Sequence, residues 1–275
     1  MFKPFIMFED VYLKPIVLSC FTILFFFSIW IALSNQTFAR EIFSESEGIQ
    51  EKWDATWAMT GETVKFGWLD CCAGPAERVP FTEEARKIRD AFAATSFLER
   101  ESLDGNRQKC ITPGMPALHL HPSLFEFAWS QNAVHIFVQD GSYRRIWTDG
   151  RIFSEDLIPA AQGTSIGYWE GDTLVVETRG ISLQSEMQVL GDLKTPPGTK
   201  MIERFSVKEG EFKTGSVYAK KMLVIETTVD APGIYKTPYT YELTFISVPL
   251  SFETGCAYAN RHSGSEVDLT PPVFE

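Results

Sequence analysis

The sequence lacks several short motifs that mark common catalytic and cofactor-binding centres. It has no phosphate-binding loop, no H-E-x-x-H metal motif, no glycine-rich dinucleotide fingerprint and no C-x-x-C pair. These absences weaken the case for an enzyme without excluding one. They also lead us to predict no cofactor and no metal ion.

Basic residues are scarce as well. The chain has 25 Lys and Arg against 36 Asp and Glu, which gives a formal net charge of −11 at pH 7. An acidic chain without a basic stripe argues against nucleic acid and against anionic lipid as partners.

One long stretch has no charge at all. No charged residue occurs between Lys14 and Arg40, and residues 16–33 form an apolar run. That run is about the minimum length for a membrane-spanning helix. Two interpretations stay open: an uncleaved signal anchor, or a long signal peptide removed near Ala39. We expect an inner-membrane, single-pass protein with its bulk in the periplasm, or a periplasmic protein after cleavage.

Cysteine is also rare, with 5 residues, and Cys20 lies in the apolar run. An even number in the exported part predicts up to two disulfides. Adjacent cysteines rarely bridge each other, so Cys71 and Cys72 are expected to pair with other residues or to stay free. We predict a bond between Cys110 and Cys256, which would tie the start of the β-region to its end, although spacing alone does not establish it.

The remaining chain divides into two zones. Residues 40–109 have a mixed pattern with a helix near 82–103, for which Thr82 is a suitable N-cap and Ala85, Ile88 and Phe92 form a partial apolar stripe.

Residues 110–275 read as a mainly β domain. Glycine beside an acidic residue predicts tight hairpin turns at residues 139–142, 148–151, 170–173 and 208–211. About eight segments rich in Val, Ile, Thr, Tyr and Phe lie around these turns. We expect an antiparallel meander that closes into a lipocalin-like barrel or folds into a sandwich.

Several motifs in this zone carry a resemblance. They are C-I-T-P-G-M-P at 110–116, R-R-I-W-T-D-G-R at 144–151 and G-T-S-I-G-Y-W-E-G-D-T-L-V-V-E-T at 163–178. The order resembles a widespread, uncharacterised family of exported bacterial β-rich proteins with the motifs C-x-P-G-x-P, R-R-I-Y-T-D-G-R and G-x-W-E-G-D-T-L-V-V-x-T. The resemblance implies export and one β-rich domain, and it brings no activity with it. The chain departs from that pattern at Ala117, where the family has arginine, and at Trp147, where it has tyrosine.

The arginine-rich motif is the leading candidate for a site. Strand alternation places Arg144 and Ile146 on one face and Arg145 and Trp147 on the other. An inward arginine needs a carboxylate partner, because an unpaired buried charge is very costly. Two roles stay open for these arginines: ion pairs that fix strand register, or a bidentate grip on an acidic ligand. The candidate carboxylate partners are Glu170, Asp172, Glu177 and Glu203.

Further candidates lie around this motif. His119 and His121 share a face if their segment is extended, but they lack a third spaced metal ligand. The full set of predicted ligand-binding residues is Arg144, Arg145, Trp147, Arg151, Trp169, Glu170, Asp172, Glu203, Arg204, His119 and His121.

Three functions are compatible with these observations. The first is a periplasmic β-domain that binds a small apolar or amphiphilic molecule. The second is an accessory subunit of an inner-membrane complex, respiratory or photosynthetic, held to neighbouring subunits through the N-terminal helix. The third is a cofactor-free lyase, isomerase or hydrolase that uses the same histidines and carboxylates.

Overall fold

The computed structural model describes residues 48–60, 79–94, 112, 114–120, 123–185, 187 and 193–250. The chain divides into two compact units, Met1–Glu51 and Lys52–Glu275, and the strands that the structure describes lie in the second. The predicted signal segment, the Cys110–Cys256 bond and His121 lie outside the described residues. Among the residues that are described, no helix combines the length and the apolar character that a membrane crossing requires.

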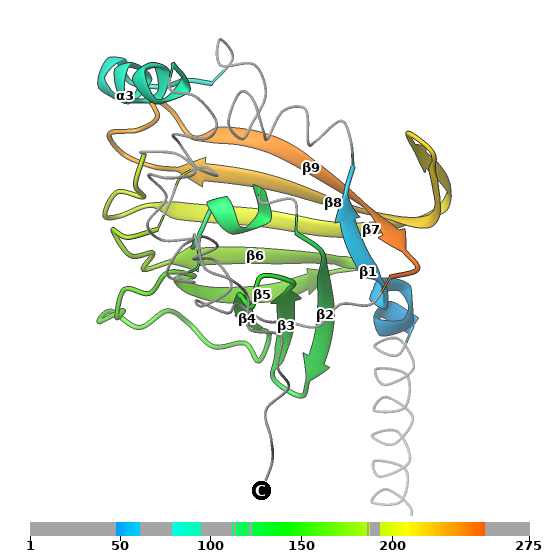
Figure 1. Ribbon diagram of the computed structural model, residues 1–275. Coiled ribbons are helices and arrows are strands. Elements are labelled where there is room, and N and C mark those ends of the chain that lie inside the picture. The colour runs from blue at the N-terminus through cyan, green and yellow to red at the C-terminus, as the bar shows by residue number, and fades with distance from the viewer. Residues whose placement is uncertain are drawn as a thin grey trace, which may run out of the picture. The chain divides into compact units, whose positions relative to one another are not determined.

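The second unit is mainly β, as predicted. Its strands form a mostly antiparallel sheet whose hydrogen bonds close into a ring (Figure 1). The strands are β1 (Thr56–Met59), β2 (Phe125–Ser130), β3 (Ala133–Val138), β4 (Tyr143–Trp147), β5 (Thr164–Glu170), β6 (Thr173–Arg179), β7 (Lys200–Thr214), β8 (Val217–Asp230) and β9 (Tyr239–Val248).

The ring is closed by a strand that the sequence analysis did not find. β1 pairs with β2 on one side, with Thr56 opposite Glu126, and with β9 on the other, with Thr56 opposite Val248. The strand has only four residues, too few to show an alternating pattern. The sheet therefore begins well before residue 110.

The turn predicted at residues 148–151 is not a hairpin. β4 and β5 are neighbours but run parallel, so a tight turn cannot join them, and residues 148–163 return the chain to the other end of the sheet. Asp149 and Gly150 still form a local turn, in which Gly150 has a φ of +77°. The predicted purely antiparallel meander is wrong at this point.

The two turns on either side of that connection are confirmed. Residues 139–142 join β3 to β4, and the Ser142 N–H donates to Asp140 Oδ1 at 2.8 Å. Gly171, with a φ of +62°, lies in the turn between β5 and β6.

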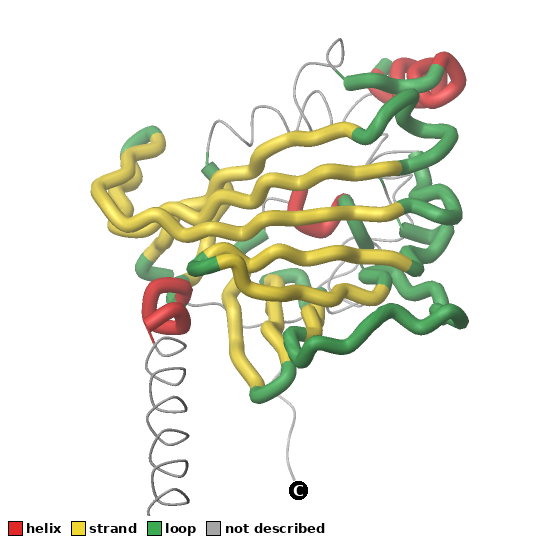
Figure 2. Tube along the Cα trace, turned by 180° about the vertical axis from the view of Figure 1, so that it is seen from behind, coloured by secondary structure: helices red, strands yellow, loops and turns green. Residues whose placement is uncertain are grey.

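The turn predicted at residues 208–211 is also wrong, because these residues continue β7. The chain reverses later, between Thr214 and Val217, and the pairing shifts between Glu209 and Phe212. β6 pairs with β7 only as far as Phe205, and β9 pairs with β8 only from Met222 onward, so residues 209–221 extend past the ring as a two-stranded arm. Figure 2 shows this arm curling away from the long strands, which lie side by side.

Helices are few in the described part of the chain. α3 (Glu83–Ala93) is shorter than predicted, but its start is confirmed, because Thr82 Oγ1 accepts the Ala85 N–H at 3.2 Å. Ala85 is buried, whereas Ile88 is 37% exposed. A short 3₁₀ segment, η1 (Ala117–Leu120), is buried along its whole length.

The interior of the ring is lined by apolar side chains from alternating strand positions. Phe205 and Phe245 are fully buried, and so are Ile136, Leu223 and Ile225. Burial of each such side chain stabilises the fold by about 1.5–3 kcal/mol. One group of polar side chains interrupts this apolar interior, and it contains an arginine and a glutamate from the predicted site.

Candidate functional site

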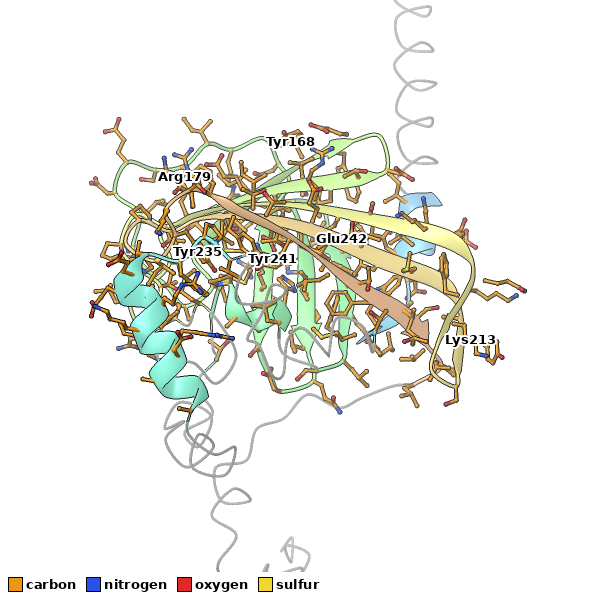
Figure 3. All side chains as sticks on the ribbon, turned by 90° about the horizontal axis from the view of Figure 1, so that it is seen from above. Tyr168, Arg179, Lys213, Tyr235, Tyr241 and Glu242 are labelled. Carbon is orange, nitrogen blue, oxygen red and sulfur yellow. The ribbon has the colours of Figure 1, made fainter. Side chains whose placement is uncertain are left out.

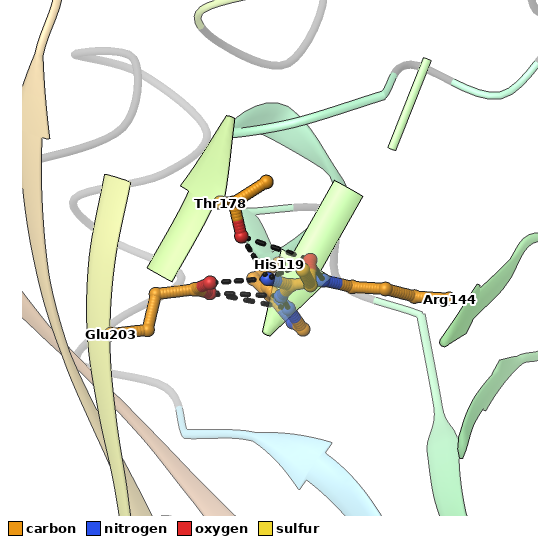
Figure 4. Close-up of polar contacts among 5 residues, drawn as sticks. His119, Arg144, Thr178 and Glu203 are labelled. Atoms are coloured by element: carbon orange, nitrogen blue, oxygen red, sulfur yellow. Dashed lines mark hydrogen bonds and ion pairs between the residues drawn. The ribbon is translucent and has the colours of Figure 1, made fainter. Parts of the chain in front are cut away.

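The interior polar group is centred on Arg144, which is 1% exposed (Figure 4). The two arginines lie on opposite faces of β4, as predicted, and the structure shows that Arg144 is the inward one and Arg145 the outward one. Its carboxylate partner is Glu203 of β7, which is 0% exposed. Of the four candidate carboxylates, the structure therefore selects Glu203.

All three nitrogens of the Arg144 guanidinium donate hydrogen bonds to neighbouring side chains. Nη1 donates to Glu203 Oε1 at 3.0 Å and to His119 Nε2 at 2.7 Å, and Nη2 donates to Glu203 Oε2. Nε donates to Ser165 Oγ at 3.2 Å, and Nη2 also reaches Thr178 Oγ1 at 2.9 Å. An arginine has five N–H donors, and all of them find acceptors here. Arg144 thus has no donor left for a ligand, and its geometry is that of an ion pair that fixes strand register.

His119 takes part in this group as a neutral acceptor. Burial lowers the pKa of His119 from 6.5 to about 4; the nearby Glu203 raises this pKa and Arg144 lowers it again. Because Arg144 can only donate, His119 Nε2 carries no proton, and the 3.6 Å approach of His119 to Glu203 Oε1 is not an ion pair at neutral pH. Its ring also meets the edges of Phe125 and Phe205.

The sequence analysis missed Ser165 and Thr178, which complete the group. They come from β5 and β6, and their hydroxyls lie 2.9 Å apart. A signal was present, because residues 163–167 read G-T-S-I-G and match the G-x-S-x-G nucleophile pattern. That motif requires a turn between a strand and a helix, however, and Ser165 lies within a strand with its hydroxyl bonded to Arg144 rather than to His119. The arrangement is therefore not a nucleophile–base pair.

The neutral state of His119 predicts how stability depends on pH. As pH falls from 6.5 to about 4, the imidazole of the unfolded chain takes up a proton while the folded protein excludes it. The free energy of unfolding should therefore decrease by on the order of 3 kcal/mol as pH falls through this window. Urea unfolding at several pH values should show a shallower decline for His119→Gln than for the wild type. Equal declines would contradict a neutral buried imidazole.

A second group of predicted residues lies on the outside of β3 and β4. Arg145, Trp147 and Arg151 stack there, with the guanidinium carbons of Arg145 and Arg151 at 4.8 and 3.5 Å from the Trp147 ring centroid. Arg151 also pairs with Asp149, and this hydrogen bond lowers the pKa of Asp149 to about 2. These residues face away from Arg144, so the side chains of the arginine-rich motif at residues 144–151 are divided between the two faces of the sheet.

The remaining predicted residues form surface pairs near the turn between β5 and β6. Glu170 accepts from Arg204 at 2.7 Å, and Asp172 pairs with Lys52. Each of these hydrogen bonds lowers the pKa of its carboxylate. The predicted ligand-binding residues that the structure describes are thus placed in separate parts of the molecule, and they do not converge on one site.

Trp169 belongs instead to an aromatic cluster around Trp53. Trp53 meets Trp169, Trp129 and Phe127 edge to face, with ring centroids 5.4, 6.0 and 4.9 Å away. Trp53 is 0% exposed, and Phe205 links this cluster to His119. The interior is therefore continuous from the aromatic cluster to the buried ion pair.

A groove of about 540 Å³ lies beside the arm, and none of the residues in these groups lines it. Its walls come from β7, β8, the end of β9 and the residues just before β1. The apolar part includes Phe212, Ala219, Val248 and Pro249, and the polar rim includes Asp54, Glu211, Lys220 and Lys221. None of the predicted ligand-binding residues that the structure describes lines this groove. Sequence reasoning missed it because its walls come from distant segments.

The described ranges contain no cluster of three or more His, Cys, Asp or Glu side chains that could hold a metal ion. Comparison with known proteins finds no matching family model, no similar curated protein and no similar solved structure. The resemblance to the exported bacterial family stays a prediction, and function has to be argued from the chain's own geometry.

Proposed function

We propose that this protein binds a small amphiphilic molecule with an anionic head in the groove beside the β7–β8 arm. The observation that carries the proposal is the groove itself, whose volume of about 540 Å³ lies in the range of small-molecule sites. Its mixture of an apolar wall and a charged rim also matches such sites.

The apolar wall would receive the tail of the molecule. Phe212 and Ala219 lie opposite each other on β7 and β8, and Val248 and Pro249 face the same space from the end of β9. Phe212 is half-buried, so part of its ring is still open to contact. Covering such a surface is favourable by about 25 cal/mol per Å² of apolar area.

Two lysines on the rim would receive the head. Lys220 Nζ pairs with Glu211 at 2.6 Å, and both side chains are mostly exposed. Lys221 Nζ donates to the backbone carbonyl of Asp54 at 3.3 Å. An exposed ion pair contributes little to stability, so an anionic head can take the place of Glu211 at small cost.

The arm forms a wall of the groove that can move to fit a ligand. Residues 209–214 of β7 and 217–221 of β8 pair only with each other in the described sheet. A two-stranded ribbon is marginally stable alone, so we expect this wall to move more than the ring.

Two naphthalene dyes test the proposal. Anilinonaphthalene sulfonate carries an anionic sulfonate, and N-phenylnaphthylamine is nearly the same molecule without that charge. We expect the anionic dye to bind the full chain more tightly. Lys220→Gln combined with Lys221→Gln should remove that preference by lowering the affinity for the anionic dye about tenfold. Phe212→Ser should weaken the binding of both dyes.

A matched control is available on the same strand. Lys200 is the exposed first residue of β7, at the end of the strand opposite the arm, and it does not line the groove. Lys200→Gln should leave the affinity for both dyes unchanged. Equal binding by the wild type and by the lysine and phenylalanine variants would place the dye elsewhere and reject the groove as the site.

The wider setting of this function is also a proposal. The closed ring of strands supports a lipocalin-like barrel, with the parallel pairing of β4 and β5 as a departure from the usual meander. The uncharged run at residues 16–33 supports export, with the binding domain in the periplasm.

A further inference from the structure

The outer face of β3 and β4 carries a group of side chains that do not line the amphiphile groove. Pairing places His135 opposite Arg145 and Phe137 opposite Tyr143, all directed away from the buried interior. Phe137 and Tyr143 remain 40% and 38% exposed. Together with Trp147, these residues form what we call the β3–β4 outer face. Large aromatic side chains are usually buried, so a group of them on a surface indicates a site of interaction.

Arg145 lies at the centre of this face and is held in place from both sides. Its Nε donates to the Tyr143 hydroxyl at 3.0 Å, and its guanidinium lies over Trp147. The Tyr143 hydroxyl is fixed in turn by His135 Nδ1 at 2.6 Å, and His135 Nε2 meets Ser130 Oγ at 2.9 Å. The guanidinium is therefore positioned before any partner arrives, which lowers the entropy cost of binding.

Arg145 differs from the other exposed arginines in its charge environment. Arg151, Arg179 and Arg204 each pair with a carboxylate. Within the described ranges, no carboxylate lies in ion-pair contact with Arg145, although the chain carries a net charge of −11.

The acidic side chains near this face do not supply that contact. Glu126, beside Phe137 on β2, accepts from the Thr56 hydroxyl, and Asp149 is bound to Arg151. The Nη groups of Arg145 thus offer a bidentate site for an external carboxylate.

We propose that the β3–β4 outer face docks an acidic segment of a partner protein. Tyrosine, tryptophan and arginine are the residue types that contribute most to protein–protein binding, and here Tyr143 and Arg145 are exposed and Trp147 is half-buried. A carboxylate of the partner pairs with Arg145, and adjacent apolar atoms of the partner cover Phe137, Tyr143 and Trp147. The cation at the centre of the face selects an acidic segment over a basic one.

The test uses the full chain and a fluorescein-labelled peptide of alternating glutamate and serine, with a lysine–serine peptide of equal length as its counterpart. Fluorescence anisotropy measures binding. We expect saturable binding of the glutamate peptide that weakens as salt rises, and no binding of the lysine peptide. Arg145→Gln should weaken glutamate-peptide binding about tenfold or more. Arg145→Lys keeps the positive charge but loses the paired N–H donors of the guanidinium, so it should weaken binding less.

Arg179 provides the matched control. It is a surface arginine that lies over an aromatic ring, Phe153, at 4.5 Å, but it is paired with Glu177. Arg179→Gln should leave peptide binding unchanged. Equal affinity of the wild type and Arg145→Gln, or equal loss in Arg145→Gln and Arg179→Gln, would overturn the proposal.

A second copy of this acidic chain is the competing occupant of the face. Sedimentation of the wild type and Arg145→Gln distinguishes the two. Self-association that is abolished by Arg145→Gln would replace the acidic partner with a second copy. A monomer that binds the glutamate peptide through Arg145 supports the proposal, whatever the result of the dye experiment on the groove.

Discussion

Glu203→Gln is expected to destabilise the fold by about 3–5 kcal/mol, because it leaves Arg144 charged and buried without a counter-charge. Both side chains of the pair are 0% exposed, so water cannot replace the lost carboxylate. The amide nitrogen of glutamine would also face a guanidinium that only donates. Urea unfolding followed by tryptophan fluorescence measures the free energy of unfolding directly.

Two comparisons make this expectation specific. Glu170→Gln breaks the Arg204 ion pair on the surface, where both side chains are more than 40% exposed, and it should change stability little. Arg144→Met combined with Glu203→Leu removes both charges and should recover much of the loss, because apolar replacements of buried ion pairs are often neutral or stabilising. A Glu203→Gln protein as stable as Glu170→Gln would show that the interior charges are not paired as the structure has them.

Trp53→Ala is the second large expected loss, also about 3–5 kcal/mol. The indole is completely buried and touches the rings of Phe127, Trp129, Trp169 and Phe205, so its removal leaves a cavity that rigid neighbours cannot fill. The same unfolding experiment measures the effect.

Trp53→Phe separates packing from hydrogen bonding. Trp53 Nε1 has no hydrogen-bond partner among the described residues, so phenylalanine loses ring volume but no hydrogen bond. We expect it to cost clearly less than alanine. Tyr168→Ala, at a side chain that is 56% exposed (Figure 3), is the surface control and should have a small effect. A Trp53→Ala protein as stable as Tyr168→Ala would mean that the aromatic cluster does not close the core.

These expectations depend on features that the sequence predicted only in part. It predicted that Arg144 and Arg145 lie on opposite faces and that an inward arginine must meet a carboxylate, because alternation and the cost of a buried charge are local rules. It could not choose Glu203 among four carboxylates, since that choice depends on strand pairing across 59 residues of chain. The neutral His119 was missed for the same reason, because its state follows from burial and from the guanidinium beside it.

The sequence by itself determined the mainly β character, most strand positions, the turns at residues 139–142 and 170–173, and the Thr82 cap. Each of these follows from periodicity or from turn and capping chemistry within a few neighbouring residues. Only the tertiary structure decided that β1 closes the ring, that β4 and β5 run parallel, and that a groove lies beside the arm. These features arise from contacts between segments far apart in the chain, where backbone hydrogen bonding rather than local pattern selects the partner.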